Sequence, residues 1–307
     1  MVNVRPLADR DAPAVAARVL ASLRADAALN SMVNGDAAAD DVLDALASVA
    51  SSVWVATSPD VVGHLHAALL SDDVFGSGAW VAPDGVSFDD PEVLAELYAT
   101  AGASWISLGA REHYAWVLDH PERTSAWLDL GFARMHQRGV RALAGLGSAP
   151  VPSGLRIRVG GLDDLDAACV LSAELDRAQA QGPSFSSMPD ASVDRSELAE
   201  ALADPDVTHY LVERGSEPVA QCLTFALASR RGSFARTVHL SAVSVREGER
   251  ARGVGTALVD HALGAARRRG FDYAETNWRV TNRRAVRFWT GYGFAPTYVR
   301  LHRTIAD

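Results

Sequence analysis

The chain has 307 residues, a formal net charge of −9, and 48% hydrophobic and 22% charged residues. This composition is ordinary for a globular protein, and the length fits about two domains. No apolar run approaches the roughly 18 residues of a membrane helix. Residues 1–5 show no export signal. We therefore expect a cytoplasmic protein with no membrane partner, and the negative charge argues against nucleic acid as a partner.

The basic residues are unevenly distributed. All 29 of them are arginine, which is typical of a GC-rich bacterial genome. Residues 246–303 contain 12 arginines against five acids, whereas the rest of the chain is strongly acidic. Such a region could hold a small polyanion. The two cysteines, Cys169 and Cys222, are too few for a disulfide framework and are expected to be reduced thiols.

The sequence of the first half, residues 1–144, predicts a mixed α/β domain. Arg5 leads through Asp9 and Asp11 into an alanine-rich helix. Strands are expected at 52–56, 61–70 and 78–82, and helices at 91–102 and 124–130. A cluster of aromatic and histidine residues is expected in the core or on a helix face, with substrate binding or a dimer contact as alternatives: Trp105, His113, Tyr114, Trp116 and His120.

No metal site is predicted. The pair His64 and His66 on an expected strand resembles half of a metal site. No further ligand at a suitable spacing accompanies it, so we expect no metal.

Residues 145–154 are rich in glycine, proline and serine and are the best linker candidate. The halves on either side are similar. Residues 127–132 and 289–294 share the pattern Trp-x-x-x-Gly-Phe at an offset of 162, and Arg158 leads to Asp164 much as Arg5 leads to Asp11. A period this long with two copies predicts a duplicated domain.

The second half, residues 155–307, is again expected to be mixed α/β. Strands are expected at 155–159, 209–213, 219–228, 236–245, 271–278 and 296–304. Helices are expected at 163–179, 196–203, 255–269 and 283–291, and a loop at 182–193.

The motif that carries chemistry joins the strand ending at Val245 to a glycine loop and a helix. Arg250, Gly253 and Gly255 lie in this loop. Glycines let the backbone approach a ligand closely, and the first turn of a helix offers unpaired N–H groups to a pyrophosphate. A Walker loop would need a lysine, which the chain lacks. A dinucleotide fingerprint would need a small residue at Leu258. Acids about 20 residues further on suit that fingerprint, but the segment 282–294 that follows does not.

With that segment, the pattern resembles the GNAT superfamily of acetyl-CoA-dependent N-acetyltransferases. The family's cofactor loop, Arg/Gln-x-x-Gly-x-Gly/Ala, is matched by Arg250, Gly253 and Gly255. The resemblance implies two tandem GNAT-like domains, each a mixed, mostly antiparallel sheet flanked by helices. It implies acetyl-CoA as co-substrate, an amine acceptor and no metal, and it leaves a homodimer open. The first half has no such loop and carries acids at 89–90, so we interpret it as a degenerate copy.

The resemblance also assigns roles to residues. The backbone of Val243, Ser244 and Val245 should pair with the pantetheine arm, and Asn282, Phe288 and Trp289 should line the cofactor channel. The N–H groups of the loop should hold the pyrophosphate, and these belong to Arg250, Ala251, Arg252, Gly253, Val254, Gly255 and Thr256.

His239 is the candidate for proton removal, because it is similar to a relay histidine on the corresponding strand of some GNAT enzymes. By strand alternation its side chain should share a face with Ser241, Val243 and Val245. Glu213 and Glu275 are the alternative bases. Trp289 occupies the position where many GNAT enzymes have a tyrosine acid, and Tyr292 and Tyr298 are nearby substitutes.

The predicted function is transfer of an acetyl or other short acyl group from CoA to a small amine by direct attack in a ternary complex. The alternatives are acetylation of a protein or peptide, and a non-catalytic acyl-CoA sensor. The loop 181–190, with Phe185 and Met188, is expected to close over the substrate or to be a surface loop.

Overall fold

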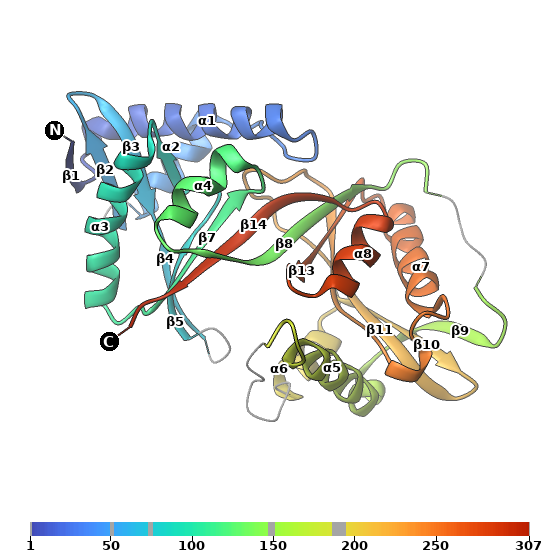
Figure 1. Ribbon diagram of the computed structural model, residues 1–307. Coiled ribbons are helices and arrows are strands. Elements are labelled where there is room, and N and C mark those ends of the chain that lie inside the picture. Colours follow the sequence, from blue (N-terminus) through green and yellow to red (C-terminus); the bar gives the residue numbers. More distant parts are fainter. Residues whose placement is uncertain (1, 50–51, 73–75, 147–150, 186–194, 307) are drawn as a thin grey trace. The chain divides into compact units, whose positions relative to one another are not determined.

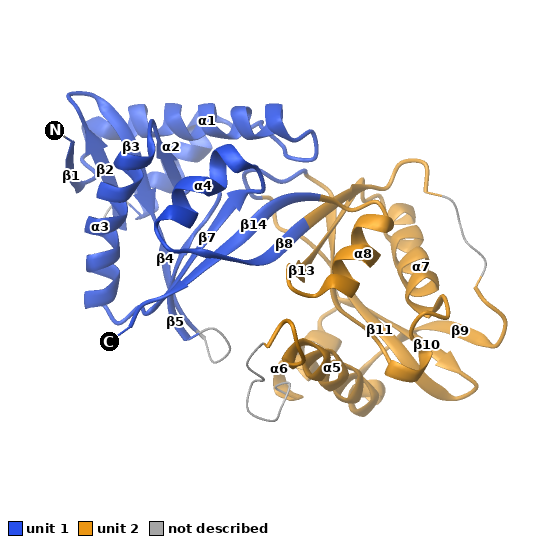
Figure 2. Cartoon of the chain, in the orientation of Figure 1, with its two compact units in different colours: residues 1–138, 230–234, 296–307 blue, residues 139–229, 235–295 orange. Residues whose placement is uncertain are grey.

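The computed structural model describes residues 2–49, 52–72, 76–146, 151–185 and 195–306. The chain forms two compact units (Figures 1 and 2). Unit 1 contains residues 1–138, 230–234 and 296–307, and unit 2 contains residues 139–229 and 235–295. The expected linker separates the halves of the sequence, but the compact units follow other boundaries. Residues 147–150 of that linker lie outside the described residues.

The first sheet of unit 1 is antiparallel and has the order β1-β2-β3-β6. Its strands are β1 (Asn3–Pro6), β2 (Val53–Thr57), β3 (Val61–His66) and β6 (Val86–Phe88). Helices α1 (Ala12–Leu29) and α2 (Ala39–Val49) pack apolar side chains against Val53 and Val55. Helix α3 (Pro91–Ser107) packs on β2 and β3 as well.

The other strands of unit 1 follow the order β4-β5-β7-β14-β8. Their bounds are β4 (Ala68–Asp72), β5 (Gly76–Val81), β7 (Glu112–Leu118), β14 (Ala295–Thr304) and β8 (Ala133–Ala142), and α4 (Pro121–Asp129) precedes β8. The single strand expected at 61–70 is wrong. The chain breaks at Ala67 because β3 pairs with β2 whereas β4 pairs with β5. The aromatic cluster expected in the core or on a helix face lies mainly on β7, and its members Trp105, His113 and Tyr114 are buried.

Unit 2 has the strand order β13-β12-β11-β10-β9, and all its predicted strands and helices are present, whereas residues 186–193 of the predicted loop lie outside the described residues. The strands are β9 (Leu155–Gly160), β10 (Thr208–Arg214), β11 (Glu217–Ala226), β12 (Thr237–Val245) and β13 (Tyr273–Arg279). The helices are α5 (Leu165–Ala180), α6 (Arg195–Ala203), α7 (Val254–Arg268) and α8 (Arg283–Gly291). α7 covers the face with Cys222 and Leu240, and α5 and α6 cover the face with Leu223.

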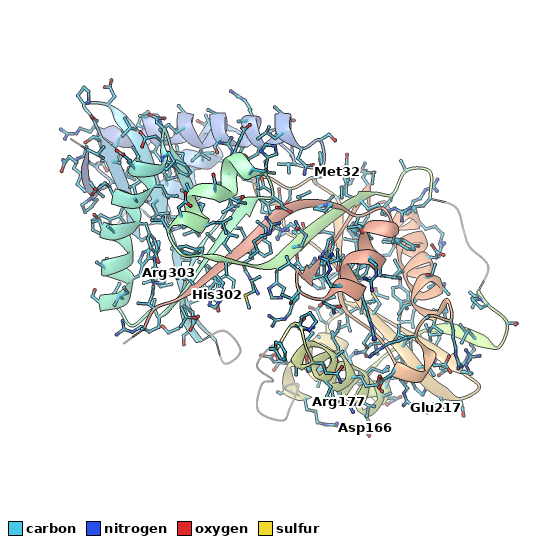
Figure 3. All side chains as sticks on the ribbon, in the orientation of Figure 1. Met32, Asp166, Arg177, Glu217, His302 and Arg303 are labelled. Atoms are coloured by element: carbon cyan, nitrogen blue, oxygen red, sulfur yellow. The ribbon has the colours of Figure 1, made fainter. Side chains whose placement is uncertain are left out.

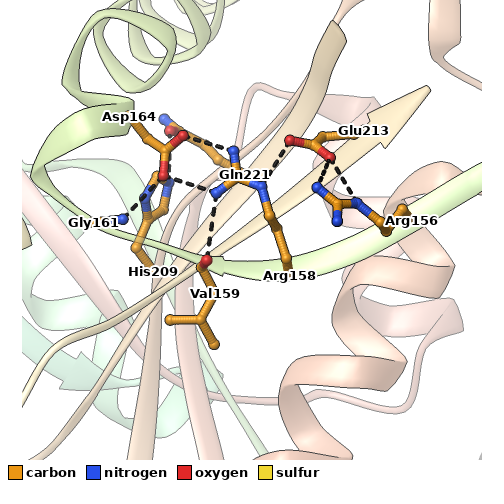
Figure 4. A network of polar contacts seen from close by, with 8 residues as sticks. All are labelled: Arg156, Arg158, Val159, Gly161, Asp164, His209, Glu213 and Gln221. Carbon is orange, nitrogen blue, oxygen red and sulfur yellow. Dashed lines mark hydrogen bonds and ion pairs between the residues drawn. The ribbon is translucent and has the colours of Figure 1, made fainter. Parts of the chain in front are cut away.

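Matching contacts in the two units support the duplication. Arg158 binds Asp164 at 2.7 Å, and the hydrogen bonds from Arg158 lower the pKa of that carboxyl group to about 2 (Figure 4). Arg5 binds Asp11 at 2.6 Å in the same way. The rings of Trp127 and Phe132 meet edge to face at 4.9 Å, and those of Trp289 and Phe294 at 5.1 Å.

The last strand of each half completes the other half's unit. Arg303 on β14, labelled in Figure 3, donates to the carbonyl of Leu130 at the end of α4 in unit 1. Arg141 on β8 donates to the carbonyl of Tyr292 at the end of α8 in unit 2. Both arginines satisfy a helix C-terminus, and they lie 162 residues apart, the same offset as the tryptophans. The final strands are therefore exchanged between the two repeats.

This exchange predicts which fragments fold. We expect residues 139–295 to unfold cooperatively and residues 155–307 not to. The second fragment lacks Arg141 and the buried Leu143, whose N–H donates to the carbonyl of Asp272, and it carries β14 without its partner β7. Circular dichroism during thermal melting measures both fragments. Cooperative melting of 155–307 together with failure of 139–295 would contradict the exchange.

Candidate functional site

The site in unit 2 begins with a bulge in β12. Gln221 pairs with Ser244 and Leu223 with Ser241, so Ala242 and Val243 together oppose Cys222 alone. Ala242 has a left-handed φ of 48°. A bulge inserts one residue and shifts the alternation of side chains.

The bulge overturns the predicted alignment of His239 with Val243 and Val245. His239 pairs with Phe225, and their ring centroids are 5.1 Å apart. Val243 and Val245 instead pack into the core cluster that contains Cys222 and α7. The prediction of a shared face is wrong because strand alternation assumes a regular strand.

The same strand separates from β13 just before the bulge. Parallel pairing runs from Thr237 with Tyr273 to Leu240 with Thr276. The Thr276 hydroxyl then donates to the Leu240 carbonyl at 3.0 Å. Beyond this point the strands are not paired, which leaves one backbone edge of residues 241–245 open to an extended ligand.

The loop after β12 presents backbone N–H groups at the start of α7. Ala251 and Gly253 have left-handed φ values of 60° and 79°. Gly253 is the N-cap and supplies no side-chain cap. The N–H groups of 251–253 have no backbone partner among the described residues. The Arg250 guanidinium donates to the Val245 carbonyl at 3.0 Å, which fixes the loop against the strand. An anion is the natural partner for such groups.

Helix α8 brings further positive charge to the site. Asn282 caps it by accepting from the Ala285 N–H at 3.1 Å. Arg283, Arg284 and Arg287 follow in the first turns and line the pocket. These three arginines were not among the predicted site residues, although the excess of arginine in residues 246–303 was a signal for them.

A pocket of about 960 Å³ gathers most of the predicted cofactor residues. Those lining it are Val243, Ser244, Val245, Arg250, Ala251, Gly253, Gly255, Thr256, Asn282, Phe288 and Trp289. Three predicted residues do not line it. Val254 is buried in the core, Arg252 is exposed near Glu249, and His239 lies further back on β12. Gln181 and Ser184, from the loop expected over the substrate, also contribute, whereas Met188 lies outside the described residues.

The aromatic residues at the pocket form a packed group. Trp289 is 5% exposed and stacks with Trp278, and its ring meets that of Phe288 edge to face at 5.0 Å. The Tyr292 hydroxyl donates to Asp260, and Tyr298 belongs to unit 1. Neither tyrosine lines the pocket.

The three candidate bases have different environments. Nδ1 of His239 lies 3.6 Å from the buried Glu275 carboxylate, and the His239 side chain is 12% exposed. Glu213 instead accepts hydrogen bonds from Arg158 and Arg156 (Figure 4), which lower the pKa of its carboxyl group. An ionised carboxylate held by two arginines is a poor proton acceptor, which argues against Glu213 as the base.

The family comparison agrees with this geometry. Residues 174–294 match the model of the Acetyltransferase (GNAT) family. The matched segment, residues 174–294, is referred to here as the GNAT domain. No curated protein matches the chain.

Solved structures extend the likeness to the whole chain. A GCN5-related N-acetyltransferase from Sphaerobacter thermophilus has a TM-score of 0.63 at 19% identity, covering 100% of this chain and 96% of that chain. A tandem GNAT protein from the clavulanic acid biosynthesis pathway has a TM-score of 0.55 at 15% identity, covering 100% of this chain and 99% of that chain. The predicted mixed α/β fold with two tandem GNAT-like halves is confirmed.

Unit 1 contains the counterpart of the GNAT domain's loop in altered form. Helix α3 follows β6 after two residues, Asp89 and Asp90, whereas eight residues join β12 to α7. The Asp90 carboxylate accepts from the N–H groups of Glu92 and Val93 at 2.9 and 3.1 Å. This helix start is therefore already occupied by a carboxylate, which would repel a phosphate.

The described residues contain neither a membrane-spanning helix nor a group of three or more metal-ligating side chains. In the His64–His66 pair, His64 is fully engaged. Its ring nitrogens lie 2.7 Å from the Ser87 hydroxyl and 3.3 Å from the Asp84 carbonyl. Burial lowers the pKa of His64 to about 4, so its ring is neutral at pH 7.

Asn282 should contribute to stability through its cap. Asn282→Ala removes the acceptor for the Ala285 N–H and should lower the free energy of unfolding by about 1 kcal/mol. Asn282→Asp keeps an acceptor and should restore most of the loss. Denaturant unfolding curves compare the variants. Equal stability of wild type and Asn282→Ala would show that the cap contributes nothing.

Proposed function

We propose that the GNAT domain transfers an acetyl or other short acyl group from acyl-CoA to the amine of a small molecule. The observation that carries this proposal is the opening between β12 and β13, which leads to an uncapped helix start surrounded by arginines. One end of the pocket suits an extended amide arm and the other suits a pyrophosphate.

The phosphate end has the donors that the group needs. The N–H groups of residues 251–256 converge at the start of α7, where the helix dipole favours an anion. Arg283, Arg284 and Arg287 add three positive charges to the lining, against the single acid Glu247. A side chain at Gly253 would meet nothing closer than Pro152 at 4.0 Å, so the loop is open on this side.

The pantetheine end is the more apolar one, with Val243, Val245 and Phe288 in its lining. The unpaired edge of Val243, Ser244 and Val245 offers backbone donors and acceptors to the amides of the arm. Phe288 forms a wall beside it, and a Cβ on Gly255 would lie 3.5 Å from Val245 and 3.7 Å from Phe288. This fit positions a thioester next to the bulge at Ala242.

His239 supplies the proton path in this proposal. The amine nitrogen attacks the thioester carbonyl carbon, the carbon–nitrogen bond forms and the carbon–sulfur bond breaks. The proton lost by the amine passes to His239, directly or through water. Glu275 lies on the Nδ1 side of the ring, so Nε2 is left to accept the proton.

The leaving thiolate does not require an acid from the protein. A thiol has a pKa of about 8.5, so the thiolate is a good leaving group near neutral pH. The indole of Trp289 cannot protonate it, and no tyrosine, cysteine or histidine is among the described residues that line the pocket. Trp289 therefore acts by packing, and water protonates the thiolate.

Cofactor binding is tested at Gly253. Calorimetry should give one acetyl-CoA site per wild-type chain, because Asp90 blocks the equivalent place in unit 1. Gly253→Asp should remove that site, since it places a carboxylate among the phosphate donors. Gly253→Asn, which has the same shape without the charge, should bind more weakly than wild type but measurably. Two sites per chain, or full affinity in folded Gly253→Asp, would refute the assignment.

The proton path is tested at His239. The assay uses an amine that the wild-type protein acetylates. His239→Ala should lower kcat about 10²–10⁴-fold at pH 7. Raising the pH should partly restore kcat, because more of the amine is then unprotonated. Acetyl-CoA affinity should hardly change, because backbone groups elsewhere hold the cofactor. Trp289→Phe is the control and should keep most of its turnover. Near wild-type rates of His239→Ala from pH 6 to 9 would move the base to Glu275 or to water.

A further inference from the structure

Unit 1 contains a cavity of about 280 Å³ that the acetyl transfer does not use. It is lined by α1, β6, β7 and α4, together with the residues next to them. It is the counterpart of the pocket in the GNAT domain. Val86 and Ser87 correspond to Val243 and Ser244, and Trp127 corresponds to Trp289, in the lining of the respective pockets. Unit 1 thus has a cavity at the equivalent place, although it lacks the phosphate loop.

One wall of the cavity is fixed by a complete network. The Arg18 guanidinium donates to the Ser87 hydroxyl at 3.2 Å, to the carbonyls of Val61 and Val62, and to Asp89 at 2.6 Å. These bonds occupy Arg18 and hold Ser87 in place. This wall shapes the cavity but offers few free groups to a ligand.

Another part of the lining carries polar groups with unused hydrogen-bonding capacity. Arg123 donates through Nε to Oδ1 of Asp26 at 2.9 Å. Its Nη1 and Nη2, and Oδ2 of Asp26, have no hydrogen-bond partner among the described residues. The side chain of Asp26 is only 7% exposed, and burial raises the pKa of its carboxyl group in spite of Arg123.

Trp127 supplies an apolar wall. Its side chain is fully buried, so its indole N–H, which has no partner in the part of the chain that the structure describes, is not reachable from the cavity. The cavity therefore combines free donors on Arg123 with a free acceptor on Asp26, against the apolar surfaces of Phe88, Trp116 and Trp127.

We propose that this cavity binds a small zwitterion of the α-amino acid class, with its carboxylate on Arg123 and its ammonium group on Asp26. The volume lies just below the roughly 300–1,000 Å³ of pockets for drug-sized ligands, so the ligand must be smaller than these. A ligand with both charges pairs with the Arg123 guanidinium and with the Asp26 carboxylate, so no charge is left unpaired. A simple amine or a simple acid pairs with only one of the two groups. The site is independent of the acyl-CoA pocket.

Calorimetry on the full chain with the twenty standard amino acids tests the proposal. At least one should bind, at one site per chain. Its amine analogue without the carboxylate and its acid analogue without the ammonium group should each bind at least about tenfold more weakly, because a charged hydrogen bond is lost. Failure of all twenty at millimolar concentration overturns the proposal.

Substitutions in α1 test whether the ligand binds in the cavity of unit 1. Asp26→Asn removes the charge that meets the ammonium group, and Ala25→Leu fills the cavity from the same helix. Both should weaken binding at least about tenfold. Ala28→Leu, on the exposed side of α1, is the matched control and should bind like wild type. Thermal melting confirms that each variant is folded. Unchanged binding in folded Asp26→Asn and Ala25→Leu would assign the ligand to another site, such as the acceptor site of the GNAT domain, and would overturn the proposal.

Discussion

Backbone pairing between β12 and β13 ends at Leu240 and Thr276, and the candidate site depends on this interruption. Continued pairing would leave no free edge on β12 and no space between the strands. The hydroxyl of Thr276 donates a hydrogen bond to the Leu240 carbonyl at the last paired position. The bulge at Ala242 then turns the following residues toward α7. The glycine loop then starts where a ligand lying along that edge would end.

The sequence predicted the parts of the site that depend on local backbone geometry. Gly253 and Gly255 identified the loop because a left-handed N-cap and an open helix start demand small residues. The bulge at Ala242 could not be predicted, since alanine has no preference for a left-handed φ. The strand exchange was missed because it joins residues about 160 positions apart, beyond the reach of any local pattern. The first and last strands of the second half, β9 and β14, were still predicted from their alternation, whereas those of the first half, β1 and β8, were not.

The two halves show how one architecture presents different polar groups at equivalent places. In the GNAT domain, eight residues join strand and helix, and the N–H groups of 251–253 have no backbone partner among the described residues. In unit 1, two residues bring Asp90 onto the equivalent groups, so the helix start is satisfied from within the chain. The neighbouring cavity is smaller, about 280 Å³ against about 960 Å³, and is lined by charged pairs. A shorter connection and a few charge differences thus separate the two sites.

The exchanged strands set the order in which the protein can be completed during translation. Residues 139–146, which unit 2 needs, leave the ribosome before the rest of that unit. Residues 296–307, which unit 1 needs beside β7, leave it only after all of unit 2. The N-terminal half must therefore wait with an open strand edge until these residues emerge. A nascent chain that stops before residue 296 should lack a strand of the half that was made first.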